Sequence, residues 1–202
     1  GATLTTTVTS WSGTNGFNLD REFTADGAGS LLDLSSLTTI ERNGGSTSSD
    51  LNINASDGGE IRLTAISGFD DNVSGINGRI HLSAVGADST IDIANVTVLD
   101  NASITVQDGG DITAQLTSLT GRSQLLKHGV DDADGDSIDM IDLSQLTDAD
   151  DATLIAEDGA TLALGATSID RTDLIARKGF LGSGGATLTT TVTSWSGTNG
   201  FN

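Results

Sequence analysis

The sequence has no cysteine, no proline and no tyrosine among its 202 residues. Without cysteine, the chain can form neither a disulfide nor a thiolate metal site. Without proline, the backbone keeps its N–H groups throughout, which suits strands that donate hydrogen bonds on both sides. Aromatic residues make up only 3% of the chain. Any core must therefore be built mainly from aliphatic side chains.

Positive charge is also scarce. Nine Lys and Arg residues stand against 28 Asp and Glu residues, and the formal net charge is −19. Proteins that bind nucleic acid place Lys and Arg against phosphates, so this balance argues against a nucleic-acid partner. It disfavours an anionic membrane surface for the same reason. No apolar run approaches the roughly 18 residues of a membrane-spanning helix, so we expect no membrane insertion.

The sequence contains a long internal repeat. Residues 1–18, GATLTTTVTSWSGTNGFN, recur unchanged at 185–202. We interpret 1–184 as one period of a tandem array and 185–202 as the start of the next identical period. The alternative is an engineered duplication that closes or caps a fold. The repeated segment has no charged side chain, so the whole net charge falls within one period. The chain begins with Gly and carries no signal peptide, so we expect a mature fragment.

A shorter motif of alternating apolar residues recurs within the period. The segment from Leu32 to Leu37, LDLSSL, is an example. Such alternation, rich in Val, Ile, Leu and Thr, is typical of β-strands. The starts lie 21–30 residues apart, so that seven units with a mean near 26 residues fill 184 residues. Matching segments begin at Ile61, Ile91, Ala114 and Ile141, and weaker ones at Leu162 and Leu4, the last repeated at Leu188.

Each unit follows the same internal order. A second short strand often follows the first, as at 51–55, 80–84 and 104–106, and an Asp-Gly turn such as Asp57-Gly58 leads to the next unit. Asp and Gly readily adopt the positive φ that a sharp corner requires. A repeat of 20–30 residues with one or two strands and sharp corners indicates stacked coils with a continuous narrow core. We therefore predict an all-β fold, a parallel β-solenoid (β-helix) with about seven coils per 184-residue period. The alternative is a β-sandwich of short strands.

Three segments resemble coils of bacterial surface β-solenoids. They are LNINASDGGEIRL (51–63), ITVQDGGDITAQL (104–116) and LIAEDGATLAL (154–164). The chain is similar, as a pattern of coils, to filamentous-haemagglutinin-like adhesins and giant repetitive cell-surface or matrix proteins. This resemblance implies an extended, secreted protein with a structural or adhesive role, located outside the cell or at its surface.

One acidic segment is a candidate metal site. Carboxylates alternate and then follow at steps of three, which resembles the loops of EF-hand-like and thrombospondin-type calcium repeats. Ca²⁺ takes six to eight oxygen ligands, and a wrapping acidic loop can supply them. The alternative is a solvated acidic loop between strands. A row of corner aspartates is a further possible cation site, with capping of turn N–H groups as the alternative. The predicted Ca²⁺ ligands are Asp132, Asp134, Asp136, Asp139 and Asp142.

The function that we expect is structural: a filament or stalk segment whose partner is the next copy of itself, head to tail. The copies would form either a covalent tandem array or a polymer of separate subunits. One alternative is an adhesin module that recognises a glycan or surface through one face. Another is a polysaccharide-degrading β-helix enzyme. The chain has two histidines, His81 and His128, and neither lies near a nucleophile motif. We therefore predict no catalytic residues and no enzyme activity.

Overall fold

The computed structural model describes residues 1–12, 20–41, 50–69, 79–129, 141–165, 168–178, 185–190 and 194–196. These residues form strands joined by turns and bends, with no helix, so this part of the chain is all-β as predicted. Every pairing between the strands is parallel. The described residues therefore offer no helix that could cross a membrane.

The strands are distributed over several parallel sheets. The largest sheet contains, in spatial order, β3 (Arg21–Asp26), β6 (Leu51–Ser56), β8 (Ile80–Val85), β11 (Ala102–Gln107), β14 (Gln124–His128), β15 (Thr153–Glu157) and β18 (Asp173–Arg177). A second sheet contains β1 (Thr3–Thr5), β4 (Leu31–Asp33), β7 (Glu60–Arg62), β9 (Thr90–Asp92) and β12 (Asp111–Thr113). Four pairs complete the set: β2 (Ser10–Ser12) with β5 (Thr39–Glu41), β10 (Val98–Asp100) with β13 (Ser118–Thr120), β16 (Thr161–Leu164) with β19 (Thr187–Thr190), and β17 (Ser168–Asp170) with β20 (Ser194–Ser196).

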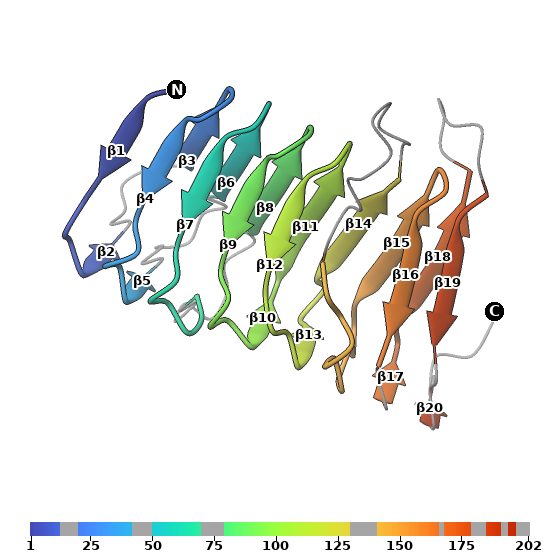
Figure 1. Ribbon diagram of the computed structural model, residues 1–202. Helices are drawn as coiled ribbons and strands as arrows, with labels where there is room; N and C mark the ends of the chain where they lie inside the picture. The colour runs from blue at the N-terminus through green and yellow to red at the C-terminus, as the bar shows by residue number, and fades with distance from the viewer. Residues whose placement is uncertain are drawn as a thin grey trace.

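The chain visits these sheets in a recurring order. Except at β14, which is followed by β15 of the same sheet, a strand of the largest sheet is followed by one on the facing side, and often by a short third strand, before the chain returns (Figure 1). Neighbouring strands in a sheet are therefore one repeat apart in the sequence. Strands β1 and β2 lie at one end of the stack, and β19 and β20 lie at the other (Figure 1). This order is what the repeated strand motif predicts.

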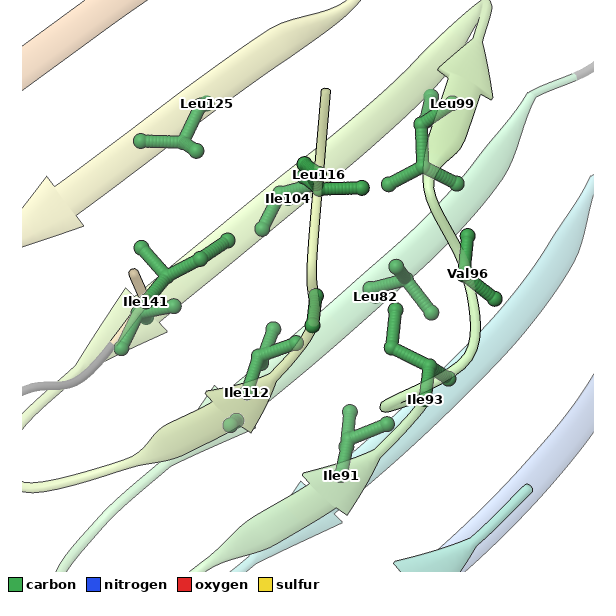
Figure 2. Packing of buried hydrophobic residues seen from close by; sticks show 14 of the residues in the cluster. Leu82, Ile91, Ile93, Val96, Leu99, Ile104, Ile112, Leu116, Leu125 and Ile141 are labelled. Carbon is green, nitrogen blue, oxygen red and sulfur yellow. The ribbon is translucent and has the colours of Figure 1, made fainter. Parts of the chain in front are cut away.

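The core is a narrow aliphatic layer between the facing sheets. Alternate residues along each strand point inward, because buried and partly buried residues alternate along β6, β8 and β11. Figure 2 shows aliphatic side chains from both sheets gathered in the space between the ribbons. Equivalent inward residues form ladders along the stack, one of which consists of Phe23, Ile53, Leu82, Ile104, Leu125, Leu154 and Leu174. The predicted motif residues are buried in the units that begin at Leu32, Ile61, Ile91, Ile141 and Leu162.

One predicted unit has the wrong start. Ile112, and not Ala114, pairs with Ile91 of the preceding unit. Further along, Leu119 lies opposite Leu99. The turn of this unit is one residue shorter than that of the preceding unit. As a result, three apolar residues beginning at Ala114 reproduce the spacing of the motif two positions too late. All of them are buried, so their hydrophobicity did not reveal the shift.

The Asp-Gly corners adopt the positive φ that the sequence predicts. Asp57 has φ 49° and Gly58 has φ 84°, and the N–H of Gly59 donates to the Ser56 carbonyl at 2.9 Å. Two consecutive positive φ values closed by this bond define a type I′ turn. We call each repeat unit of the stack a rung. The second glycine is needed for space, because a Cβ on Gly59 would lie 2.1 Å from the backbone oxygen of Ala25 on the preceding rung. Positive φ also occurs at the corresponding residues Asp108, Gly109, Asp158 and Gly159.

The corner aspartates do not form the uninterrupted row that we considered. At the ladder position that directly follows the strands of the largest sheet, aspartates alternate with glycines from rung to rung. Like charges there are separated by two rungs, or about 9.6 Å. That distance is close to the Debye length in physiological salt, which reduces their repulsion. In order, the residues at this position are Gly27, Asp57, Gly86, Asp108, Gly129 and Asp158.

Candidate functional site: the two ends of the strand stack

The N-terminal end of the stack consists of β1 and β2. Strand β1 pairs with β4, with Leu4 opposite Leu32, and β2 pairs with β5, with Trp11 opposite Ile40. The Trp11 ring packs edge-to-face on Phe23, with ring centroids 5.5 Å apart. Leu4 is nevertheless 64% exposed, because no described strand covers its other side. This end therefore presents apolar surface to solvent.

The C-terminal end carries the second copy of the same segment. Strand β19 pairs with β16, with Leu188 opposite Leu162, and β20 pairs with β17. Leu188 is the repeat equivalent of Leu4, but it is partly buried against the core. The same sequence therefore stacks on the strands that follow it in the first copy and on the strands that precede it in the second.

These two pairings use opposite edges of the strand. In a parallel ladder, successive residues direct their backbone groups alternately to the two neighbouring strands. In the first copy, Ala2 accepts from the N–H of Leu31 at 2.8 Å, and Thr6 donates to Asp33 at 3.1 Å. In the second copy, the N–H of Thr187, the equivalent of Thr3, donates to the Ala160 carbonyl at 2.9 Å. In this strand, positions 2 and 6 thus bond forward and position 3 bonds backward, so one strand can bond on both sides at once.

The outermost strands of the largest sheet match each other in the same way. Among the described strands, β3 pairs only with β6, and β18 pairs only with β15. On β18, Leu174 occupies an inward position and Arg177 an outward one. The corresponding positions of β3 are held by Phe23, which also packs against the core, and by Asp26. At the same inward ladder position, both ends of the sheet therefore have an apolar residue. At the same outward position, one end has a cation and the other has an anion.

The predicted Ca²⁺ ligands fall mostly outside this description. Asp132, Asp134, Asp136 and Asp139 lie outside the described residues. Asp142 is exposed, and its Oδ1 accepts from the N–H of Ser144 at 2.8 Å. Hydrogen bonds from the Ser144 backbone and side chain lower the pKa of Asp142. Asp33 and Asp92 accept the same bond from the residue two places on, at 3.0 Å each, so Asp142 caps a turn as its repeat equivalents do.

The sequence analysis missed another group of ligand-type side chains. His128, Glu157 and Asp158 are the described residues that lie close enough together to hold a metal ion. His128 and Glu157 are far apart in the sequence and meet only because β14 and β15 are neighbours. The other histidine, His81, lies on the outward face of β8. Its Nε2 is 3.3 Å from Asp50 Oδ2.

Comparisons with protein families, curated proteins and solved structures find no match for this chain. We therefore infer the function from the geometry of the two ends.

Proposed function

We propose that this chain is a segment of an extended structural filament or stalk, built from tandem β-solenoid repeats that stack end to end. One observation carries the proposal. The described first strand of the identical segment, Thr3–Thr5 in one copy and Thr187–Thr190 in the other, bonds through opposite edges in its two positions. A copy of this segment can therefore be bonded on both sides at once, which is the position it occupies inside a continuous array. We infer a covalent tandem array located outside the cell or at its surface.

The repeated segment itself adds no charge to the junction between periods. The repeated segment contains no charged side chain, and β16, on which its second copy stacks, contains none either. Two periods with a formal net charge of −19 each can therefore meet at these strands without apposing like charges. Their total charge keeps separate filaments apart in solution.

The register of the junction follows from the ladder of the largest sheet. If β3 of a following period continues this sheet beyond β18, its Phe23 stacks on Leu174 and its Asp26 lies beside Arg177. Aliphatic and aromatic side chains then close the core. On the outside, Asp26 and Arg177 form an opposite-charge pair, and exposed pairs of this kind contribute about 0.2–1 kcal/mol. The same register places Glu22 beside Asp173, both of them exposed, and this like-charge contact opposes the pair.

A chain of two periods, 1–184 followed by 1–202, tests the proposal. Seven rungs at ~4.8 Å each predict that the extra period adds about 34 Å to the maximum dimension measured by small-angle X-ray scattering. The cross-section should not change. Negative-stain electron microscopy should show one straight rod. Two separate lobes, or an increase in cross-section, would refute end-to-end stacking.

Charge reversal at the junction tests its register. Arg177→Glu in the first period should lower the unfolding midpoint more in the two-period chain than in the single-period chain. Asp26→Arg in the second period should remove this additional loss of stability, because it restores an opposite-charge pair at the junction. Arg171→Glu is the matched control, because Arg171 pairs with Asp151 inside one period. Its cost should be equal in both chains. Equal costs for Arg177→Glu as well would contradict the proposed register.

No specific observation on the described residues favours the adhesin or the polysaccharide-degrading enzyme, and both stay alternatives.

A further inference from the structure

A histidine and two acidic residues converge where β14 and β15 end. His128 is the last residue of β14 and lies directly opposite Glu157, the last residue of β15. Asp158 follows in the corner, and its Oδ2 is 2.7 Å from His128 Nε2. One ligand atom from each of the three residues lies within 4.8 Å of the other two. The side chains are 16%, 12% and 1% exposed for His128, Glu157 and Asp158.

The backbone holds this arrangement in place. Asp158 has φ 50° at the first position of its type I′ corner, which directs the chain sharply away from β15. Gly129 occupies the equivalent position on the β14 rung. A Cβ at Gly129 would lie 2.6 Å from the Ala160 backbone nitrogen, so no side chain fits there. The Asp158 carboxylate therefore has the imidazole of His128 as its near neighbour from the adjacent rung.

We propose that His128, Glu157 and Asp158 bind a divalent transition-metal ion, for which Zn²⁺ is the probe. An imidazole nitrogen and carboxylate oxygens suit Zn²⁺ and similar ions, whereas Ca²⁺ takes six to eight oxygen ligands. The metal ion takes the place of the direct Nε2–Oδ2 contact. The ligands then separate slightly, since donor atoms around Zn²⁺ each lie about 2.0–2.2 Å from the metal. Water completes the coordination.

Two further charged groups adjoin the site. Arg177 donates from Nε to Glu157 Oε1, so Glu157 Oε2 is the oxygen for the metal. Asp108 Oδ1 lies 3.9 Å from His128 Nδ1, which is buried without a hydrogen-bond partner among the described residues. A carboxylate behind a ligating imidazole fixes the tautomer with the proton on the far nitrogen. Asp108 is therefore a positioning residue that leaves Nε2 free for the ion. The three carboxylates and one guanidinium give a net negative site.

The test is Zn²⁺ titration of the metal-free 202-residue chain by calorimetry, in competition with a chromophoric chelator. We expect one site per chain and a shift of the His128 ring ¹⁵N signals on binding. His128→Ala, Glu157→Gln and Asp158→Asn should each lower the affinity at least tenfold. Asp158→Asn preserves the shape of the side chain, so it tests the site even if His128→Ala fails to fold. Circular dichroism checks each variant.

His81→Ala is the matched control. His81 also contacts an aspartate, Asp50, but the described residues place no third ligand there. This variant should therefore bind Zn²⁺ with unchanged affinity. Asp108→Asn should lower the affinity about 10–100-fold and change the His128 ring tautomer, and Asp108→Glu should restore both.

The acidic segment requires its own control, because it follows His128 closely in the sequence. Replacing Asp132, Asp134 and Asp136 together by Asn should leave the Zn²⁺ site intact. The proposal is overturned if this variant abolishes Zn²⁺ binding while Asp158→Asn does not. It is also overturned if the unaltered chain shows no stoichiometric binding. Neither result would affect the end-to-end stacking, which does not involve these residues.

Discussion

Replacing Ser123 by alanine should destabilise the chain by about 2–3 kcal/mol. Ser123 is fully buried in a corner. Its Oγ accepts from the N–H of Ala102, on the preceding rung, at 3.0 Å, and its hydroxyl donates to the Thr120 carbonyl. Alanine removes both bonds. A typical hydrogen bond contributes about 1 kcal/mol net, and a buried group left without a partner costs about 1–3 kcal/mol. Ala102 is itself fully buried, so water cannot replace the lost acceptor.

The assay is urea unfolding followed by circular dichroism, with Ser103→Ala as the control. Ser103 lies on the outward face of β11, next to Ala102, so its replacement should cost less than about 0.5 kcal/mol. Ser89 offers a graded comparison. Its Oγ accepts from the Gly58 N–H at 3.0 Å, and Gly58 is only half-buried. Ser89→Ala should therefore cost less than Ser123→Ala. If Ser123→Ala costs no more than Ser103→Ala, hydroxyl groups do not link the rungs as argued here.

Three further outcomes are expected. Ile93→Ala should cost about 2–5 kcal/mol in urea unfolding because Ile93 is fully buried, whereas Val98→Ala, at a site 48% exposed, should cost less than about 0.5 kcal/mol; similar costs would contradict the described core. Burial, and then the nearby Asp92, raise the pKa of Asp111 above its ordinary 3.8, so the folded chain loses stability as the pH rises from 3.8 through the raised value. Asp111→Asn should therefore raise the urea midpoint at pH 7 but not at pH 3, and a gain equal at both pH values would exclude this cause. Ca²⁺ calorimetry tests the acidic segment: binding should be lost in a triple Asn variant but not in Ser144→Ala, and no Ca²⁺ binding by the unaltered chain would refute the prediction. The residues replaced in that variant are Asp132, Asp134 and Asp136.

Much of the fold follows from local patterns in the sequence. Strands with inward residues such as Ile61 and Leu63 alternate with period two, because the faces of a strand alternate. The Asp57-Gly58 corner is predictable because few residues tolerate positive φ. Both signals lie within a few neighbouring residues. They therefore predict the class of each element without knowledge of its partners.

Features that depend on pairing between rungs were harder to predict. The shift from Ala114 to Ile112 arises from a one-residue difference in turn length, which leaves the apolar spacing intact. The contact of His128 with Glu157 depends on which strands are neighbours and on their register. A residue pattern within one rung contains neither kind of information. The identical ends were visible in the sequence, but their use of opposite strand edges emerged only from the hydrogen bonds.

The parallel ladders have a mechanical consequence. In every sheet the backbone hydrogen bonds run from strand to strand along the stack, slanted as in all parallel sheets. Tension along the stack therefore loads the rungs in series, and each rung bears the whole force through only the few residues of its strands. Such a rod resists bending through its continuous core, but under axial tension it yields one rung at a time. Each released rung adds 20–30 residues of slack chain, which lengthens the molecule before the neighbouring rungs open.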